Sequence, residues 1–501
     1  MLKRNLIANY LGQGWTALMG LAFIPLYIKY LGIEAYGLIG LFALLQAWLS
    51  LLDIGMTPTL GREMARFTGG GHSTESIRDL LRSIEFIAMG VALLIAIGIA
   101  LSANWIATTW LKANSLSYEV VTQALVVMGL VTAIRFIEGV YRSAIVGLQR
   151  QVLFNAIYSL MATLRAVGAL VILVWVSASI DAFFMWQGFV SIATLIILAA
   201  TIYTSLPPAK RRARFSMDSL LGVWRFAGGM VGITILALLL TQVDKILLSK
   251  LLTLSEYGYY TLAATVAAAL HMLISPITQA WYPHLCELHA RNDQPTLAQT
   301  YHQGAQLVSV MAGSAAIVMI LHSETFLRLW TQDSALAQRT ALVLSLLILG
   351  NLLNGLMWIP YQTQLAHGWT SLMVRINIVA VSVIVPAVVW VTPRYGAEGA
   401  AWVWVSLNAG YVLIGIHFMH RKILTKEKWR WYGQDVLAPL CASLLCTGTF
   451  TLIWPAPPGF LADLAQLIFA AIISMSSALL GANRTRQQLG KWISHITRIE
   501  R

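Results

Sequence analysis

The stretch from Phe86 to Ala103, FIAMGVALLIAIGIALSA, contains no charged residue. It lies inside an apolar run over residues 84–111 that is long enough for the roughly 20 residues a helix needs to cross a bilayer core. Backbone polar groups in lipid must be paired within the segment itself, so runs of this kind are expected to be helices. The short alternating segments of a transmembrane β-barrel do not appear in the sequence.

The same apolar character extends over the whole chain of 501 residues. Hydrophobic residues make up 58% and charged residues 11%, whereas soluble domains carry about 25% charged residues. Too few charges remain to cover a surface exposed to water, which predicts an all-α, multi-pass membrane protein. About fourteen spans are expected, at 6–29, 36–59, 84–111, 119–146, 153–176, 181–205, 223–250, 256–283, 303–323, 336–362, 370–392, 397–419, 433–454 and 461–482.

The distribution of Lys and Arg predicts which side of the membrane each loop faces. With the N-terminus inside, about 23 basic residues fall in inside segments and about 6 in outside segments. This asymmetry agrees with the positive-inside rule and predicts that both termini are cytoplasmic. The net charge of +13 is therefore interpreted as a topology signal and not as a sign of nucleic-acid binding.

Two landmarks recur at nearly one offset, which suggests an internal repeat. Glu34-Ala35-Tyr36-Gly37 opens the second span and Ser255-Glu256-Tyr257-Gly258 the eighth, while Asn155 is matched by Asn377. Two parallel six-helix halves explain this pattern, and a chance match of common residues is the alternative. The expected domains are a bundle over 1–205, a basic linker over 206–222, a bundle over 223–425, two additional helices within 426–482 and a basic tail over 483–501.

Short motifs in the same order resemble the polysaccharide flippases, which export O-antigen and exopolysaccharide repeat units. They are Tyr30-Leu31-Gly32 with Leu52-Asp53-Ile54-Gly55-Met56 and Arg62, Gly147-Leu148-Gln149-Arg150, Gln242-Val243-Asp244-Lys245-Ile246-Leu247, and Tyr395-Gly396-Ala397-Glu398-Gly399-Ala400. These flippases belong to the multidrug/oligosaccharidyl-lipid/polysaccharide exporter superfamily. The resemblance implies two bundles in a V around a central cavity, in the bacterial inner membrane.

The resemblance also implies a substrate and partners. The substrate is an undecaprenyl-pyrophosphate-linked oligosaccharide that moves from the cytoplasmic to the periplasmic leaflet for O-antigen, lipopolysaccharide or exopolysaccharide biosynthesis. The lipid bilayer is the surrounding partner, and a polysaccharide polymerase and a chain-length regulator are further partners to expect. No cofactor is expected, and direct use of ATP is disfavoured because no nucleotide-binding motif is present. The energy source would be a proton or sodium gradient, or downstream consumption of the flipped product.

Charged residues at membrane depth are candidate functional residues, because burying them in lipid is costly. Arg135, Glu138 and Arg142 are spaced to share one helical face, so Glu138 is expected within reach of either arginine. Arg165 and Arg375 add positive charge in other spans. These arginines are predicted to bind the substrate's pyrophosphate through bidentate hydrogen bonds. A network of salt bridges that holds the bundle together is the structural alternative.

Three further charged residues have two readings each. Lys245 is a candidate for substrate contact and Asp244 for a coupling proton or sodium ion, or each pairs with a neighbouring helix. Asp53 is a proton site or, more simply, the partner of an arginine in its bundle. Prolines are expected to interrupt helices, which is common at transport sites but also tolerated elsewhere in membrane helices. They are Pro25, Pro58, Pro276, Pro360 and Pro386.

Other functions leave signals that are weaker or missing. The segment from His284 to His289 lacks a second cluster of ligands, so it predicts an interfacial helix end and not a metal site. A multidrug exporter of organic cations is expected to have an acidic or aromatic cavity, whereas basic residues outnumber the clear acids at membrane depth here. A peptidoglycan-precursor flippase remains open because its lipid carrier is the same. A membrane-embedded glycosyltransferase or polymerase is disfavoured by short outside loops, so a transporter rather than an enzyme is expected.

Overall fold

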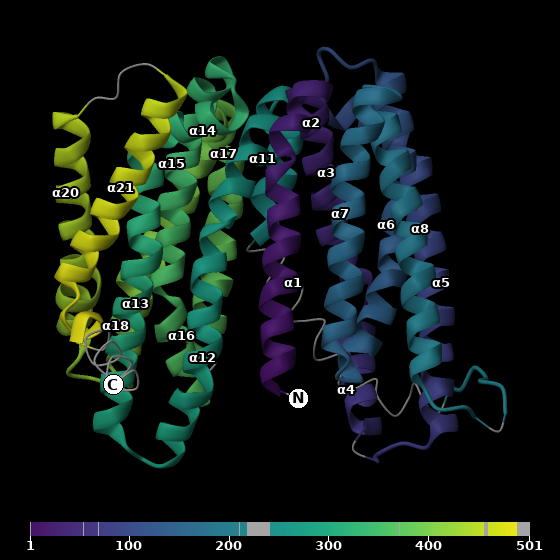
Figure 1. Ribbon diagram of the computed structural model, residues 1–501, viewed down its shortest axis with the longest axis horizontal. Coiled ribbons are helices and arrows are strands. Elements are labelled where there is room, and N and C mark those ends of the chain that lie inside the picture. Colours follow the sequence, from purple (N-terminus) through teal and green to yellow (C-terminus); the bar gives the residue numbers. More distant parts are fainter. Residues whose placement is uncertain are drawn as a thin grey trace, which may run out of the picture. The chain divides into compact units, whose positions relative to one another are not determined.

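The computed structural model describes residues 2–53, 55–68, 70–209, 211–217, 241–369, 371–454 and 459–487 (Figure 1). Its regular elements in these ranges are all helices. Twelve of the described helices are long and apolar enough to cross a membrane, which confirms a multi-pass, all-α membrane protein. The predicted helix at 223–250 lies outside the described residues up to residue 240, as do parts of the linker and of the basic tail. The count of fourteen therefore stays a prediction.

Two compact units make up the chain, Met1–Gly258 and Tyr259–Arg501. Helix α11 (Leu254–Ala268) begins in the first unit and continues into the second. The predicted domain boundaries and the V-shaped arrangement stay predictions. Each unit is described by itself below.

In the first unit, the central helix is α6, which packs against α4, α5 and α8, while α7 packs against α1 and α8. Ser73, Ser117 and Ser179 start α5, α6 and α8 by accepting a hydrogen bond from a backbone N–H three residues on. The elements are α1 (Leu2–Ala22), α2 (Ile24–Leu31), α3 (Ile33–Leu49), η1 (Ser50–Asp53), α4 (Met56–Thr68), α5 (Thr74–Trp105), η2 (Ile106–Trp110), α6 (Tyr118–Gly147), α7 (Gln151–Trp175) and α8 (Ile180–Ser205).

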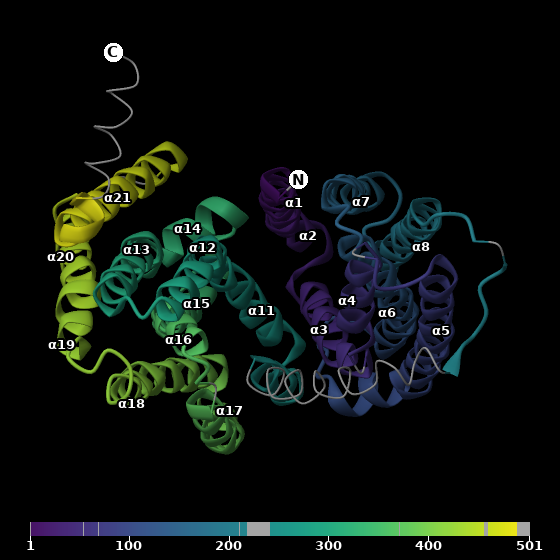
Figure 2. The same ribbon diagram turned by 90° about the horizontal axis from the view of Figure 1, so that it is seen from below.

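In the second unit, α13 has α20 and α21 on one side and α12 and α15 on the other (Figure 2). In the most apolar stretch of α13, 67% is buried, whereas in the corresponding stretch of Leu372–Met419, which includes most of α17, only 17% is buried. Helix α13 therefore lies inside the unit and α17 at its surface. The elements are α12 (Leu270–Ala290), α13 (Gln294–Leu321), α14 (Ser323–Thr331), α15 (Ser334–Leu356), α16 (Trp358–Ala366), α17 (Ser371–Gly410), η3 (Tyr411–Gly415), α18 (Ile416–Met419), α19 (Lys428–Arg430), η4 (Trp431–Leu437), α20 (Ala438–Ile453) and α21 (Phe460–Gly481).

Helix α17 covers the predicted span 370–392 from residue 371 on and the first part of the span 397–419, which continues through η3 and α18. Gly396 interrupts the helical geometry there with φ 58° and ψ −146°. A side chain would be strained in this conformation, which glycine adopts readily. The two spans are therefore joined by a break at Gly396 and not by a longer loop. This glycine belongs to the Tyr395–Ala400 motif.

The two copies of the repeated Tyr-Gly motif lie against each other inside the first unit. A Cβ added to Gly37 would stand 2.5 Å from the carbonyl oxygen of Leu254, and one added to Gly258 would collide with the carbonyl oxygen of Ile33. Only glycine permits helices α3 and α11 to approach so closely at their N-terminal ends. The motif that indicated the repeat thus has a packing role.

Candidate functional site

Arg135 on α6 points into the interior of the first unit. Its Nε donates to Ser191 Oγ at 3.2 Å, and its two Nη atoms donate to Gln46 Oε1 at 3.2 Å and Gln187 Oε1 at 3.0 Å. The guanidinium carbon lies 5.0 Å from the centre of the Phe42 ring. All three acceptors are neutral, so they fix the orientation of the guanidinium without cancelling its charge.

Glu138 and Arg165 lie near Arg135 but remain incompletely paired. Glu138 is 6% exposed, and its Oε1 has no hydrogen-bond partner among the described residues. The same holds for Nε and Nη2 of Arg165, which are buried. The charges of Arg165 and Arg135 act on Glu138 through space. The first unit therefore encloses two arginines and one carboxylate with unused hydrogen-bonding capacity.

Arg142 departs from the predicted single stripe. It is exposed, and its guanidinium lies over the α7 rings of Phe154 and Tyr158, at 5.8 and 6.0 Å from their centres. The expected ion pair of Glu138 with Arg135 or Arg142 is not formed between these described residues, which corrects the prediction that Glu138 reaches either arginine. The reason is that Arg135 turns toward α3 and α8, whereas Arg142 turns toward α7.

Asp244 and Lys245 lie in the helical residues 241–251, which precede α11. Lys245 Nζ donates to the carbonyl oxygen of Thr241 at 3.0 Å and to Gln242 Oε1 at 3.2 Å, both within one turn of its own helix. Asp244 takes part in a polar interaction as well. Their predicted roles in substrate contact and ion coupling stay proposals.

Asp53 has a local structural role. Its carboxylate accepts the backbone N–H of Thr57 at 3.0 Å and the Thr57 hydroxyl at 2.5 Å. These bonds cap the start of α4, where backbone N–H groups otherwise lack partners. The Leu52–Met56 motif thus ends η1 and begins α4, and no arginine pairs with Asp53 among the described residues.

Arg375 stands on the exposed side of α17, at an apolar groove. The groove has a volume of about 800 Å³ and lies between the two legs of α17, with Trp402 and Tyr411 among its lining residues. Arg375 is the one charged residue that lines it. Both snorkelling to the membrane interface and contact with an anionic headgroup are compatible with this position.

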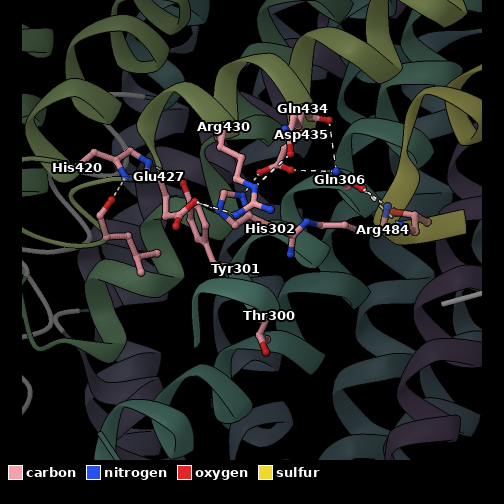
Figure 3. A network of polar contacts seen from close by, with 12 residues as sticks. Thr300, Tyr301, His302, Gln306, His420, Glu427, Arg430, Gln434, Asp435 and Arg484 are labelled. Carbon is pink, nitrogen blue, oxygen red and sulfur yellow. Dashed lines mark hydrogen bonds and ion pairs between the residues drawn. The ribbon is translucent and has the colours of Figure 1, made fainter. Parts of the chain in front are cut away.

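A second buried polar cluster, in the second unit, was missed from the sequence (Figure 3). His302 on α13 lies between two carboxylates: Nδ1 contacts Asp435 on η4, and Nε2 lies 2.9 Å from Glu427 Oε2. Gln306, one turn along α13, donates to the other oxygen of Asp435 at 3.0 Å. His302 and Asp435 are almost fully buried, at 1% and 0% side-chain exposure.

Two arginines lie beside this cluster. Arg430 Nε donates to Gln434 Oε1 at 3.1 Å, and its Nη1 lies 3.6 Å from Glu427. Arg484, just after α21, donates its backbone N–H to Gln306 Oε1 at 3.1 Å. Burial and the nearby charge of Arg430 lower the pKa of Arg484. Although burial opposes it, hydrogen bonds and charges from His302 and Arg430 hold the pKa of Glu427 below its usual value.

One signal in the sequence pointed to this cluster. Asp435 falls within the predicted span 433–454, so the rule for charges at membrane depth applies to it as much as to Asp53. His302 stands one residue before the predicted span 303–323, with Gln306 on the same helical face. That these helices are neighbours could not be derived from either segment alone.

Comparisons with known proteins identify the family of this chain. A family model described as polysaccharide biosynthesis protein matches residues 2–289. A putative O-antigen transporter of Shigella flexneri is 19% identical over 403 residues, which cover 80% of this chain and 93% of that protein.

Solved structures share the fold. The lipid II flippase MurJ in an inward closed conformation matches with a TM-score of 0.69 and 12% identity, over 95% of this chain and 98% of its own. An inward-facing multidrug transporter of the MATE family matches with a TM-score of 0.63 and 15% identity, over 82% and 96%. These likenesses show the fold, and they confirm the resemblance inferred from the motifs. Because the family model covers more than half of the chain, the protein belongs to the polysaccharide biosynthesis protein family and has the fold of the multidrug/oligosaccharidyl-lipid/polysaccharide exporter superfamily.

Proposed function

We propose that the protein is a flippase that moves undecaprenyl-pyrophosphate-linked oligosaccharide repeat units across the bacterial inner membrane for O-antigen or exopolysaccharide biosynthesis. One observation carries the proposal: Arg135 is held inside the first unit by three neutral oxygens and has no carboxylate ion-pair partner among the described residues. A pyrophosphate is a dianion that must cross a medium of low dielectric constant. An oriented guanidinium offers it charge and parallel hydrogen bonds.

The cost of burying arginine supports a functional role. A charged side chain at the centre of a membrane helix costs on the order of 3 kcal/mol, so its retention needs a compensating benefit. An ion pair would supply a structural benefit, but the bonds of Arg135 are to Ser191, Gln46 and Gln187. Arg165, with two buried nitrogens that lack partners among the described residues, adds a second source of positive charge. Arg142, Lys245 and Arg375 are proposed as further contacts along the path.

The energy source and orientation belong to the same proposal. Both termini are placed in the cytoplasm by the positive-inside rule. A proton or sodium gradient drives the cycle, with Glu138 and Asp244 as candidate coupling groups. The polymerase and the chain-length regulator of the polysaccharide pathway are the proposed downstream partners.

Translocation in proteoliposomes tests the proposal. Purified protein receives a fluorescent undecaprenyl-pyrophosphate oligosaccharide, and a membrane-impermeant glycosidase reports its arrival in the outer leaflet. We expect exposure faster than in empty liposomes, and a loss of at least about tenfold in Arg135→Ala, because a hydrogen bond to a charged group contributes about 1.5–3 kcal/mol. Arg394→Ala is the matched control, since this exposed arginine lies over Trp390 at 4.4 Å.

Three other results would point elsewhere. Transport of the peptidoglycan precursor in preference to the oligosaccharide lipid would indicate a precursor flippase. Efflux of a cationic dye without lipid exposure would indicate a multidrug exporter. A change in the glycan itself would indicate a glycosyltransferase. Each of these results would overturn the proposed substrate while leaving the family assignment intact.

A further inference from the structure

A polar pocket of about 710 Å³ opens within the second unit, beside the His302 cluster. Its lining comes from three segments that are far apart in sequence: the first turns of α13, residues 427–438 around α19 and η4, and residues 481–487 at the end of α21 and just after it. Gln303, Gln434, Arg430 and Arg484 contribute polar groups to its wall. The pocket belongs to the second unit, and its lining includes none of the residues around Arg135.

Both carboxylates of this cluster are engaged by His302. Its two ring nitrogens face carboxylate oxygens, Nδ1 toward Asp435 and Nε2 toward Glu427 at 2.9 Å. His302 therefore occupies one oxygen of each acid.

Because His302 engages the carboxylates of Asp435 and Glu427, positive charge remains on the pocket wall. Arg430 approaches Glu427 only at 3.6 Å and bonds the neutral Gln434. The guanidinium of Arg484 forms no hydrogen bond or ion pair within the part of the chain that the structure describes. Burial and the charge of Arg430 lower the pKa of Arg484, although Asp435 and Glu427 oppose this, and both arginines line the same pocket. Arg430 and Arg484 therefore line the pocket beside carboxylates that His302 already engages.

We propose that this pocket binds a phosphate-bearing anion, which the guanidiniums of Arg430 and Arg484 and the side-chain amides of Gln303 and Gln434 would hold. Paired guanidiniums with neutral amide donors match the tetrahedral oxygens of phosphate, and an anion between them removes their mutual repulsion. The volume exceeds that of a single phosphate group and accommodates a pyrophosphate or a phospholipid headgroup. The site would link α13 to the segment that follows α21, and it is independent of the proposed flippase activity.

Two sources can supply this chemistry, and the experiment separates them. The full-length protein is placed in nanodiscs of phosphatidylcholine, and intrinsic tryptophan fluorescence records its thermal unfolding. One arm adds sodium pyrophosphate at constant ionic strength, with sodium sulfate as the reference anion. The other arm replaces part of the lipid with phosphatidylglycerol. We expect saturable stabilisation in at least one arm.

Three variants decide whether the pocket is responsible. Arg430→Gln and Arg484→Gln should each weaken the half-saturating concentration about tenfold or more. Gln303→Glu should do the same by adding a negative charge to the wall, and no hydrogen bond described for the fold depends on Gln303. Arg421→Gln is the control, an exposed arginine that lies over Phe418 at 5.6 Å and does not line the pocket.

Each outcome has one meaning. Stabilisation by pyrophosphate that the variants weaken supports a site for a soluble phosphate compound. Stabilisation only by phosphatidylglycerol, again weakened by the variants, supports a lipid headgroup. No saturable effect in either arm, or an effect that Gln303→Glu and both arginine variants leave unchanged, overturns the proposal.

Discussion

At the scale of single residues, Arg135 shows how a charge can be oriented without being neutralised. Its three hydrogen bonds come from α3 and α8, so the helices fix the plane of the guanidinium. We predict that Arg135→Lys keeps some transport but falls about tenfold below wild type, because lysine keeps the charge and loses the planar fork. Initial rates of lipid exposure in proteoliposomes measure this. Equal rates for the lysine variant and wild type would show that charge alone suffices.

Glu427 gives a prediction about pH. Since the pKa of this carboxyl is held below its usual value of 4.5, its contribution to folding is complete above pH 4.5 and disappears as the pH falls through the lowered pKa. Protonation removes an acceptor from His302 and a partner from Arg430. Thermal unfolding between pH 3 and 7 should therefore show a steeper loss of stability in acid for wild type than for Glu427→Gln. Parallel curves for the two proteins would contradict this.

The residues that could best be predicted from the sequence are charged residues inside apolar segments, because the cost of burying such a charge is evident from one segment alone. Arg135 and Arg165 were selected because charges inside apolar runs are expensive, and the structure places both in the interior of the first unit. Asp53 was also selected, but its cap on α4 depends on where η1 ends. The His302 cluster depends on contacts between segments more than 120 residues apart, which helical periodicity does not report.

At the scale of elements, an ion pair joins α14 to α21. Arg328 donates from Nε to Asp463 Oδ2 at 3.1 Å and from Nη2 to Oδ1 at 2.9 Å, and Asp463 is 8% exposed. We predict a coupling free energy of about 1–2 kcal/mol in a double-mutant cycle of Arg328→Ala and Asp463→Ala, measured by unfolding in detergent. Glu324→Ala should cost much less, because this carboxylate reaches Arg328 only at 3.9 Å. Additive single effects would show that the pair does not hold α21.

The contact between α3 and α11 depends on two glycines. Gly37→Val and Gly258→Val should each destabilise the protein by about 1–3 kcal/mol, because the added carbons collide with backbone carbonyl groups that cannot rotate away. Gly98→Val is the control, since a Cβ there meets nothing within 4 Å. Unfolding in detergent compares the three variants. If Gly258→Val were as stable as Gly98→Val, the close approach would not be required.

Helix positions were predicted well, and helix breaks less well. Pro25, Pro58 and Pro360 stand in the first turns of α2, α4 and α16, where the missing N–H costs nothing. Pro276 and Pro386 lie inside α12 and α17, which continue through them. A proline in the sequence does not reveal whether neighbouring helices compensate for the lost hydrogen bond. The break at Gly396 was predicted as a loop between two spans.

At the scale of the whole molecule, composition sufficed for the membrane class because it is a property of the entire surface. The predicted repeat rests in part on the Tyr-Gly motif, whose two glycines both have a packing role. The site for the substrate is a different matter, since it depends on which faces of the helices meet. Helices α6 and α13 each pack against several other helices. The apolar pattern of either helix therefore does not indicate which helix it contacts.

The sidedness of the chain is the property of the whole molecule that labelling can test directly. Cys286, Cys441 and Cys446 are first replaced by alanine, and single cysteines are introduced as Thr68→Cys, Leu116→Cys, Ala335→Cys and Thr425→Cys, which lie in connecting segments or next to them. A membrane-impermeant maleimide applied to spheroplasts should label the positions at 116 and 335 at least about tenfold faster than those at 68 and 425, because basic residues favour the cytoplasmic side. Permeabilised cells control for reactivity. Labelling at 68 and 425 in intact spheroplasts would reverse the predicted orientation, and it would place the His302 pocket, which is lined by Glu427 close to Thr425 in the chain, on the periplasmic side.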